Sequence, residues 1–139
     1  MDQELSNKNL MLSVIHALKE GNVEPLFAAV SPEIFLKSNA PHEFFRFGGP
    51  RVGLAELKAH IALIFSQYHF VRFEPEVIMT EGEKVCGQFE FEAFHRRSSK
   101  TVKSGISIRW TVQGGKIIEH EGFFDTASVL MQQGDLVAA

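Results

Sequence analysis

Residues 71–95 read VRFEPEVIMTEGEKVCGQFEFEAFH and decide the class of fold. Across residues 85–95 the side chains alternate, with Phe89 on one side and Glu90 on the other. A period of two is typical of β-strands, whose successive side chains point to opposite faces of a sheet. The Glu-Gly-Glu segment centred on Gly82 predicts a turn between two such strands. This stretch therefore predicts a β-hairpin.

Two further strands follow the hairpin. Residues 104–112 and 116–124 are rich in apolar and β-branched side chains, and a Gly-Gly pair at residues 114–115 predicts the tight turn between them. A polar segment over residues 96–100 predicts the preceding turn, and a short helix capped by Asp125 is expected at the end. Four hairpin-linked strands of this kind predict an antiparallel meander.

Upstream of residue 71 the spacing of apolar side chains changes to that of helices. Apolar residues recur at intervals of three and four over residues 10–18, 23–30 and 54–68, which predicts three helices, the last being the strongest signal. Residues 34–36 predict a short strand, and the aromatic, Gly- and Pro-containing stretch over residues 42–53 predicts a loop.

This order of elements predicts an α+β fold in which three N-terminal helices pack on one face of a curved antiparallel sheet. The 139 residues suffice for one domain, which we place at residues 1–139. A twisted sheet wrapped on a long helix leaves a tapered, cone-shaped interior. Such a cone is either filled by side chains or holds a ligand.

Composition excludes several classes of partner. The net charge of −3 gives no positive field for nucleic acid, and the six histidines lack the spacings of a metal site, so we expect neither nucleic acid, metal nor cofactor. The single cysteine, Cys86, permits no internal disulfide and favours a reducing compartment. The acidic start at Met1-Asp2 and the lack of a long apolar run disfavour secretion and membrane insertion. We expect a cytoplasmic protein.

Three short sequence segments resemble those of a known protein family. They are GPRVG at residues 49–53, WTVQGGKII at residues 110–118 and EGFFD at residues 121–125. With the order of elements, they resemble the SnoaL-like branch of the nuclear transport factor 2-like superfamily over roughly the whole chain. The resemblance implies a cone-shaped fold with an internal pocket and frequent dimerisation through the outer face of the sheet. Members include polyketide cyclases, ketosteroid isomerases, epoxide hydrolases, dehydratases and noncatalytic proteins, so the family does not select one activity.

The resemblance also implies where acidic residues would stand. Epoxide hydrolases and cyclases of the superfamily carry an acid on the last strand at the position that matches Gly122 here. The hydrolases carry an Arg and an Asp on the central strand, at positions that match Gln88 and Glu90. The departures at Gly122 and Gln88 argue against an epoxide hydrolase.

Glu90 and His120 are the candidate catalytic residues. A carboxylate facing an apolar cone has a raised pKa and suits general acid–base chemistry. Equally, Gln88, Glu90 and Glu92 together fit a solvated sheet face, and alternation alone does not identify the inner face. His120 either replaces the missing carboxylate as a base or packs at the pocket edge with one hydrogen bond. Catalysis by this pair requires both side chains to enter one cavity.

The expected ligand-binding residues are polar or aromatic side chains near the predicted pocket. Arg109 either stabilises an oxyanion or pairs across strands with a glutamate such as Glu119 or Glu121. Tyr68, the only phenol, either donates a hydrogen bond to a ligand or packs in the core. Phenylalanines of the aromatic loop either cover the pocket or anchor the loop. The full set is Gln88, Arg109, Tyr68, Phe44, Phe47, Trp110 and Phe124.

Two functions remain open. The first is a cofactor-independent isomerase, cyclase or dehydratase that acts by proton transfer on a small, apolar, oxygenated molecule. The second is a noncatalytic dimeric protein that binds a hydrophobic small molecule. We expect a homodimer through the outer sheet face, because the strands carrying Phe89, Phe91 and Trp110 predict more apolar surface than one helical layer covers.

Overall fold

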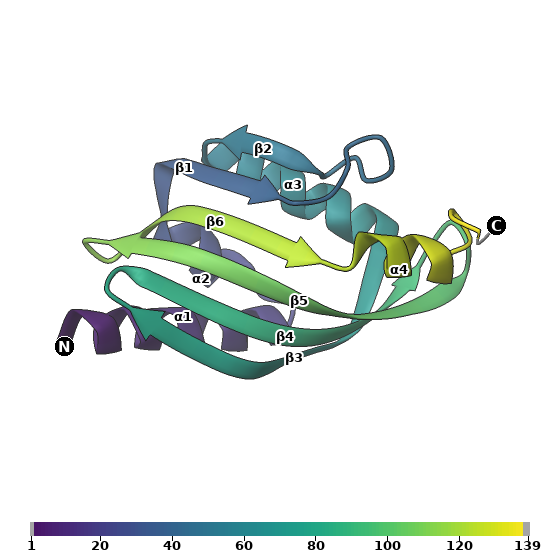
Figure 1. Ribbon diagram of the computed structural model, residues 1–139. Coiled ribbons are helices and arrows are strands. Elements are labelled where there is room, and N and C mark those ends of the chain that lie inside the picture. The colour runs from purple at the N-terminus through teal and green to yellow at the C-terminus, as the bar shows by residue number, and fades with distance from the viewer. Residues whose placement is uncertain (1, 138–139) are drawn as a thin grey trace.

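The structure of the chain, a computed structural model, describes residues 2–137. Figure 1 shows a sheet with helices behind it and a short C-terminal helix at one end. In chain order the elements are α1 (Asp2–Lys19), α2 (Glu24–Ala29), β1 (Val30–Ser38), β2 (Gly49–Val52), α3 (Leu54–Gln67), β3 (Tyr68–Glu81), β4 (Lys84–His95), β5 (Lys100–Gln113), β6 (Lys116–Phe124) and α4 (Thr126–Gln132).

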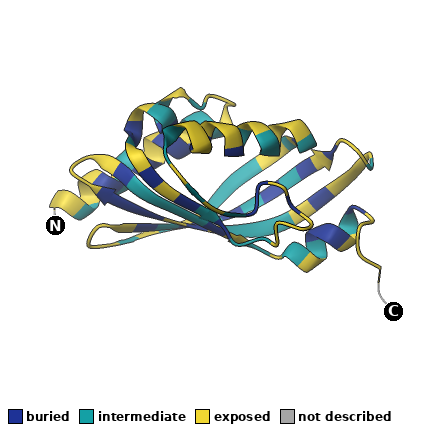
Figure 2. Cartoon of the chain, turned by 90° about the horizontal axis from the view of Figure 1, so that it is seen from above, coloured by how far each residue is buried: buried dark blue, intermediate teal, exposed yellow. Residues whose placement is uncertain are grey.

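The strands form one curved sheet in the order β2-β1-β6-β5-β4-β3. The hairpins from β3 to β6 pair antiparallel, as the sequence predicts. The exception is β1, which lies parallel to β6 and aligns Leu36 with His120. Helices α1, α2 and α3 lie on one side of the sheet, and both views agree on this (Figures 1 and 2). The predicted α+β fold, with its N-terminal helices on a curved sheet, is confirmed.

Several element boundaries differ from the prediction, including the starts of α1, β3 and β5, which lie earlier in the chain. Strand β1 spans nine residues rather than the three predicted. Strand β2 lies inside the predicted loop and pairs with β1 at the sheet edge, where Pro50 is tolerated because an edge strand leaves one row of N–H groups unpaired. Helix α3 ends at Gln67, and Tyr68 has the extended angles φ −132° and ψ 138° of a strand residue rather than a helical one.

Strand β4 shows which face of the sheet is inside. Its buried residues alternate strictly and include Phe89 and Phe91, whereas Glu90 lies among the partly exposed ones. Figure 2 shows the same alternation as bands of colour along the strands. In the core, Phe89 stacks on Phe73 with ring centroids 4.8 Å apart.

The prediction that Phe89, Phe91 and Trp110 form an apolar outer surface is wrong. These side chains are 0%, 9% and 2% exposed and lie on the inner face. The outer face instead carries polar side chains such as Gln88 and Arg109 between a few exposed aromatics. No helix within residues 2–137 has the length and apolar character needed to span a bilayer.

Candidate functional site

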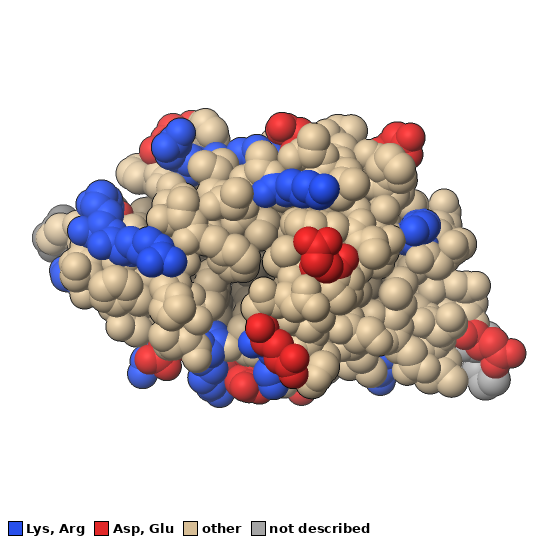
Figure 3. Space-filling model, turned by 180° about the vertical axis from the view of Figure 1, so that it is seen from behind, with Lys and Arg blue, Asp and Glu red and all other residues tan. Residues whose placement is uncertain are grey.

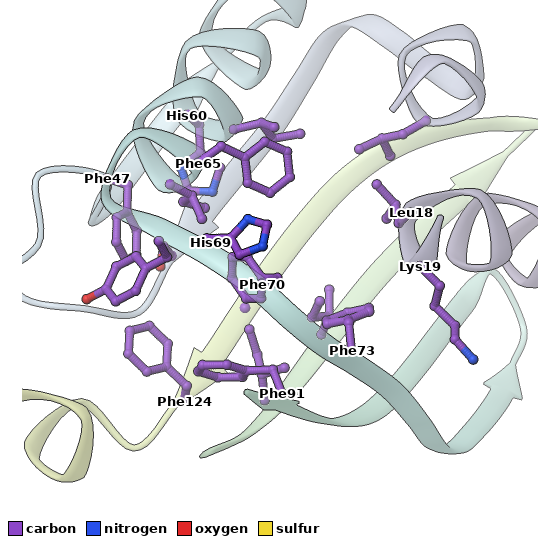
Figure 4. Close-up of a pocket in the computed structure, with 18 of the residues that line it drawn as sticks. Leu18, Lys19, Phe47, His60, Phe65, His69, Phe70, Phe73, Phe91 and Phe124 are labelled. Carbon is purple, nitrogen blue, oxygen red and sulfur yellow. The ribbon is translucent and has the colours of Figure 1, made fainter. Parts of the chain in front are cut away.

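A cavity of about 640 Å³ lies between α3, the end of α1 and the inner face of the sheet. It borders both groups of buried apolar residues, the one around Trp110 and the one around Phe91. Seen from the helix side in Figure 3, the surface is hollowed near its centre, and basic and acidic side chains gather at one margin. Figure 4 shows aromatic rings from several elements turned toward a common space.

The wall of the cavity is mostly aromatic and aliphatic. Two of its phenylalanines, Phe45 and Phe47, come from the loop before β2, and each is at most 5% exposed. Gly48 lets this loop turn tightly, because a Cβ there would lie 2.3 Å from the carbonyl oxygen of Ala40. The other apolar lining residues include Leu26, Leu57, Ile61, Ile64, Phe65, Phe70, Phe73, Phe91, Ile106, Ile108 and Phe124.

His60 places an imidazole in this wall from α3. The residue is 6% exposed, and its Nδ1 atom has no hydrogen-bond partner within the described residues. Burial and, to a smaller extent, the charge of Arg51 lower its pKa to about 4, and an interaction with the Phe47 backbone opposes this shift. His60 is therefore neutral at pH 7. The sequence analysis did not select it, although its position three residues after Leu57 puts it on the apolar stripe of α3.

His120 enters the same cavity from β6. Its Nδ1 atom accepts a hydrogen bond of 2.9 Å from the indole Nε1–H of Trp110, its cross-strand partner. Burial and, to a smaller extent, the neighbouring His60 lower the pKa of His120 to about 4. The structure therefore brings together two neutral histidines, of which the sequence analysis had selected one.

Glu90 does not join His120 in the cavity. Its side chain lies on the outer face with Gln88, and a Cβ at Gly105 would lie within 3.3 Å of both side chains. Gln88 accepts a hydrogen bond there from the hydroxyl of Ser107. The sheet separates Glu90 and Gln88 from the cavity, so the arrangement matches the solvated-face alternative.

Arg109 also lies on the outer face. Its guanidinium donates to the carboxylate of Glu121, the cross-strand partner. A hydrogen bond from Asn39 and a second one from Arg109 hold the pKa of Glu121 below its usual range. Partial burial of the carboxylate opposes this shift. This is the cross-strand pair that the sequence offered as the alternative to an oxyanion site.

Tyr68 lines the cavity with its ring, but its hydroxyl is already bonded. The hydroxyl donates to Oε1 of Gln133 at 2.6 Å, and Gln133 in turn donates to Asp135 at 2.7 Å. Burial raises the pKa of Tyr68 to about 12. The phenol therefore links β3 to the segment after α4.

The remaining predicted ligand-binding residues divide in two. Phe47 and Phe124 line the cavity, with their ring centroids 6.3 Å apart. Phe44 is 57% exposed and lies outside the described lining, and Trp110 stands behind His120 rather than in the wall.

Within residues 2–137, the carboxylates that line the cavity are solvent-exposed ones. Gly122 occupies the wall where the family resemblance implied an acid. The lining glutamates are Glu20 and Glu74, whose side chains are 67% and 44% exposed, and Lys19 pairs with Glu74 at 2.9 Å. The inner part of the cavity thus offers imidazoles and apolar surface.

Solved structures share this architecture. An NTF2-like protein of unknown function from Burkholderia pseudomallei aligns with a TM-score of 0.81 at 18% identity, covering 91% of this chain and 96% of its own. TerC, co-crystallised with polyporic acid, aligns with a TM-score of 0.82 at 19% identity, covering 93% and 98%. A hypothetical protein with a ketosteroid isomerase-like fold from Catenulispora acidiphila, in complex with trimethylamine, aligns with a TM-score of 0.76 at 14% identity, covering 93% and 97%.

These likenesses show the fold. No curated protein matches the chain in sequence. The family model of the SnoaL-like domain matches residues 12–120, which span α1 to β6 and every segment of the cavity wall except its C-terminal edge. The chain belongs to the SnoaL-like domain family, with the fold of the nuclear transport factor 2-like superfamily.

Proposed function

We propose that this chain binds a small, largely apolar, uncharged molecule in the cavity. The observation that carries the proposal is the wall itself, which is mostly aromatic and aliphatic. Its buried polar side chains include the neutral imidazole of His60 and the hydroxyl of Ser38, and the partly exposed His120 adds a second neutral imidazole. Its volume of about 640 Å³ lies in the range of small-molecule sites, roughly 300–1,000 Å³.

The charges around the cavity support an uncharged ligand. Moving a charged group into an apolar interior is costly unless an opposite charge awaits it. The inner wall supplies none, because His60 and His120 stay neutral at pH 7. The charged lining residues are all at least partly exposed, and Lys19 pairs with Glu74; the set is Lys19, Glu20, Lys37, Arg72, Glu74 and Arg96. A ligand with a charged end would therefore leave that end near solvent.

Structural relatives are consistent with a ligand in this fold. TerC was crystallised with polyporic acid, and the protein from Catenulispora acidiphila with trimethylamine. Both are similar to this chain in architecture at 14–19% identity, so they support the general use of the fold and not a particular ligand.

Binding without turnover is better supported than catalysis. A proton-transfer enzyme needs a base whose pKa lies near the working pH, and imidazoles with pKa values of about 4 are weak bases at pH 7. Glu90 lies on the other face of the sheet. The observation that favours catalysis as a second candidate is the placement of two imidazoles in one wall, where one polarises a carbonyl and the other accepts a proton.

A cavity-filling variant tests the binding function. Gly122 has room for a side chain, because the nearest atom to an added Cβ is Ile106 Cδ1 at 4.0 Å. We expect Gly122→Leu to place its side chain in the inner part of the cavity, beside Ile106, and to weaken binding of apolar probes such as 1-tetralone at least about tenfold in titration calorimetry. The control Ser107→Leu adds the same side chain on the outer face and is expected to bind as the parent does. Equal binding by parent and Gly122→Leu would refute the cavity as the site.

We also propose that two copies pair through the outer face of the sheet. The support is a set of exposed aromatic side chains on that face, Phe35, Phe94 and Phe123, which are 36–42% exposed. Register places them there, because Phe35 aligns with Glu119 and Phe123 with Ser107, both outer-face residues. Burying such rings between symmetric copies is the usual way to form a twofold interface.

A further inference from the structure

We infer that the inner end of the cavity recognises a neutral oxygen atom of the ligand through the Nε2–H group of His120, and that Trp110 determines which His120 nitrogen carries this proton. The inference rests on the proposed binding function and names the chemistry that the bound molecule must present.

The first step is the direction of the hydrogen bond between Trp110 and His120. An indole Nε1 carries one hydrogen and has no lone pair to offer, so it only donates. At 2.9 Å from Nε1, the Nδ1 atom of His120 must therefore be the acceptor. A doubly protonated imidazole has no acceptor nitrogen, so the bond also requires a neutral ring.

The second step is the tautomer. A neutral imidazole carries its single hydrogen on one nitrogen, and Nδ1 is occupied as an acceptor. The hydrogen must then lie on Nε2. Trp110 is 2% exposed and is held edge-on against Phe89, with ring centroids 6.1 Å apart, so the donor that sets the tautomer is itself fixed.

The third step is the environment of Nε2. Within residues 2–137 the described hydrogen bonds of His120 include only the one from Trp110. His120 lines the cavity and retains partial exposure although it lies beneath the helices, so its free donor faces the cavity space. Close by, the Nδ1 atom of His60 is a second polar atom without a partner.

These groups select among ligand chemistries. A ketone, quinone or hydroxyl oxygen accepts from Nε2–H without bringing a charge into the apolar wall. An ammonium group would meet a donor rather than an acceptor at His120. A carboxylate would lose its hydration with no cation in the inner wall to replace it. The expected ligand is thus an apolar skeleton with a neutral oxygen at its inner end.

The tautomer is testable without a ligand. We expect long-range ¹H–¹⁵N spectra of the histidine rings at pH 7 to show His120 as the neutral Nε2–H form. Trp110→Phe removes the indole donor and is expected to yield a mixture of the two tautomers. Val14→Ala removes methyl groups from the same buried cluster, on α1 and not on the strands that carry the Trp110–His120 bond, so it should keep the parent signature. An Nδ1–H or charged His120 in the parent protein overturns the inference.

Matched probes test the recognition. 1-Tetralone and tetralin share a skeleton and differ by one ketone oxygen. We expect His120→Leu to lower the ratio of tetralone to tetralin affinity about fivefold to tenfold, the value of one hydrogen bond. His120→Gln offers an amide oxygen to Trp110 and an N–H to the ligand, so it is expected to keep the ratio within about twofold.

The outcomes separate the two proposals. If both probes bind the parent and the ratio is unchanged in His120→Leu, the oxygen-recognition inference fails while the binding function stands. If neither probe binds the parent or Gly122→Leu, the proposed function fails, and the inference falls with it whatever tautomer the spectra show.

Discussion

Among the described residues His60 is buried without a hydrogen-bond partner for Nδ1, and this burial ties the stability of the protein to pH. Its folded-state pKa of about 4 is below the ordinary value of 6.5. Between these values the unfolded chain binds more protons than the folded one, so stability is complete above pH 6.5 and falls as the pH drops toward 4. A shift of this size corresponds to about 3 kcal/mol.

We expect urea unfolding at pH 7 and pH 4.5 to show this loss of stability. His60→Leu fills the same space without a titrating group and should lose a smaller part of its unfolding free energy between the two pH values. His120 has a pKa shift of the same direction and leaves a residual dependence in that variant. An unfolding free energy that is equal at both pH values in the parent would contradict the lowered pKa values.

Tyr68 makes its one hydroxyl contact away from the cavity. Removing the hydroxyl in Tyr68→Phe leaves Oε1 of Gln133 without its donor. We expect a loss of about 1–2 kcal/mol of unfolding free energy, the usual cost of an unsatisfied buried group. Because the ring stays in the wall, affinity for 1-tetralone should stay within about twofold of the parent. A large loss of affinity at unchanged stability would instead make the phenol a ligand contact.

The positions of some of these residues could be predicted from the sequence. The helical spacing that predicted α3 already placed His60 on the apolar stripe, so the signal was present and was not used. The unpaired Nδ1 of His60 and the Trp110–His120 bond depend on long-range packing and have no counterpart in local spacing.

The strands illustrate what periodicity predicts and what it leaves open. Alternation of apolar and polar residues located β4 and β6. The same alternation results whichever face of the sheet is buried, so it does not identify the inner face. The side of Glu90 is decided by the neighbours of β4, since Phe89 and Phe91 pack in the buried clusters with apolar residues of the helices. Strand β2 escaped prediction because its four residues contain Pro50 and begin with the second glycine of a Gly-Gly pair, signals that favour a loop.

Adjacent positions on β4 test the assignment of faces. Phe91→Ala removes a ring that packs on Phe70 at 5.6 Å between centroids, and we expect it to cost about 3 kcal/mol of unfolding free energy. Glu90→Ala on the opposite face should change stability by less than about 0.5 kcal/mol and leave probe binding unchanged. Denaturant titration and calorimetry of the two variants provide the comparison. A loss of binding in Glu90→Ala would restore this carboxylate to the site.

At the level of the assembly, the outer sheet face is expected to join two copies. Sedimentation velocity at micromolar concentration should report the mass of a dimer for the parent. Phe123→Glu places a charge among the exposed aromatics of that face and should shift the protein to monomer. Leu5→Glu, at a residue 56% exposed on α1, provides a matched substitution away from the sheet and should leave the dimer intact. A monomeric parent would refute the interface.

The parallel pairing of β1 with β6 has a consequence for the order of folding. The hairpins from β3 to β6 join neighbours in the chain and close short loops, whereas the alignment of Leu36 with His120 closes a loop that contains most of the sheet. Loop-closure entropy makes such a distant contact slower to form. Amides of β4 and β5 therefore gain protection from solvent exchange before those of β1. We expect the meander from β3 to β6 to form first, so that the space that would receive a ligand becomes enclosed only when β1 pairs with β6.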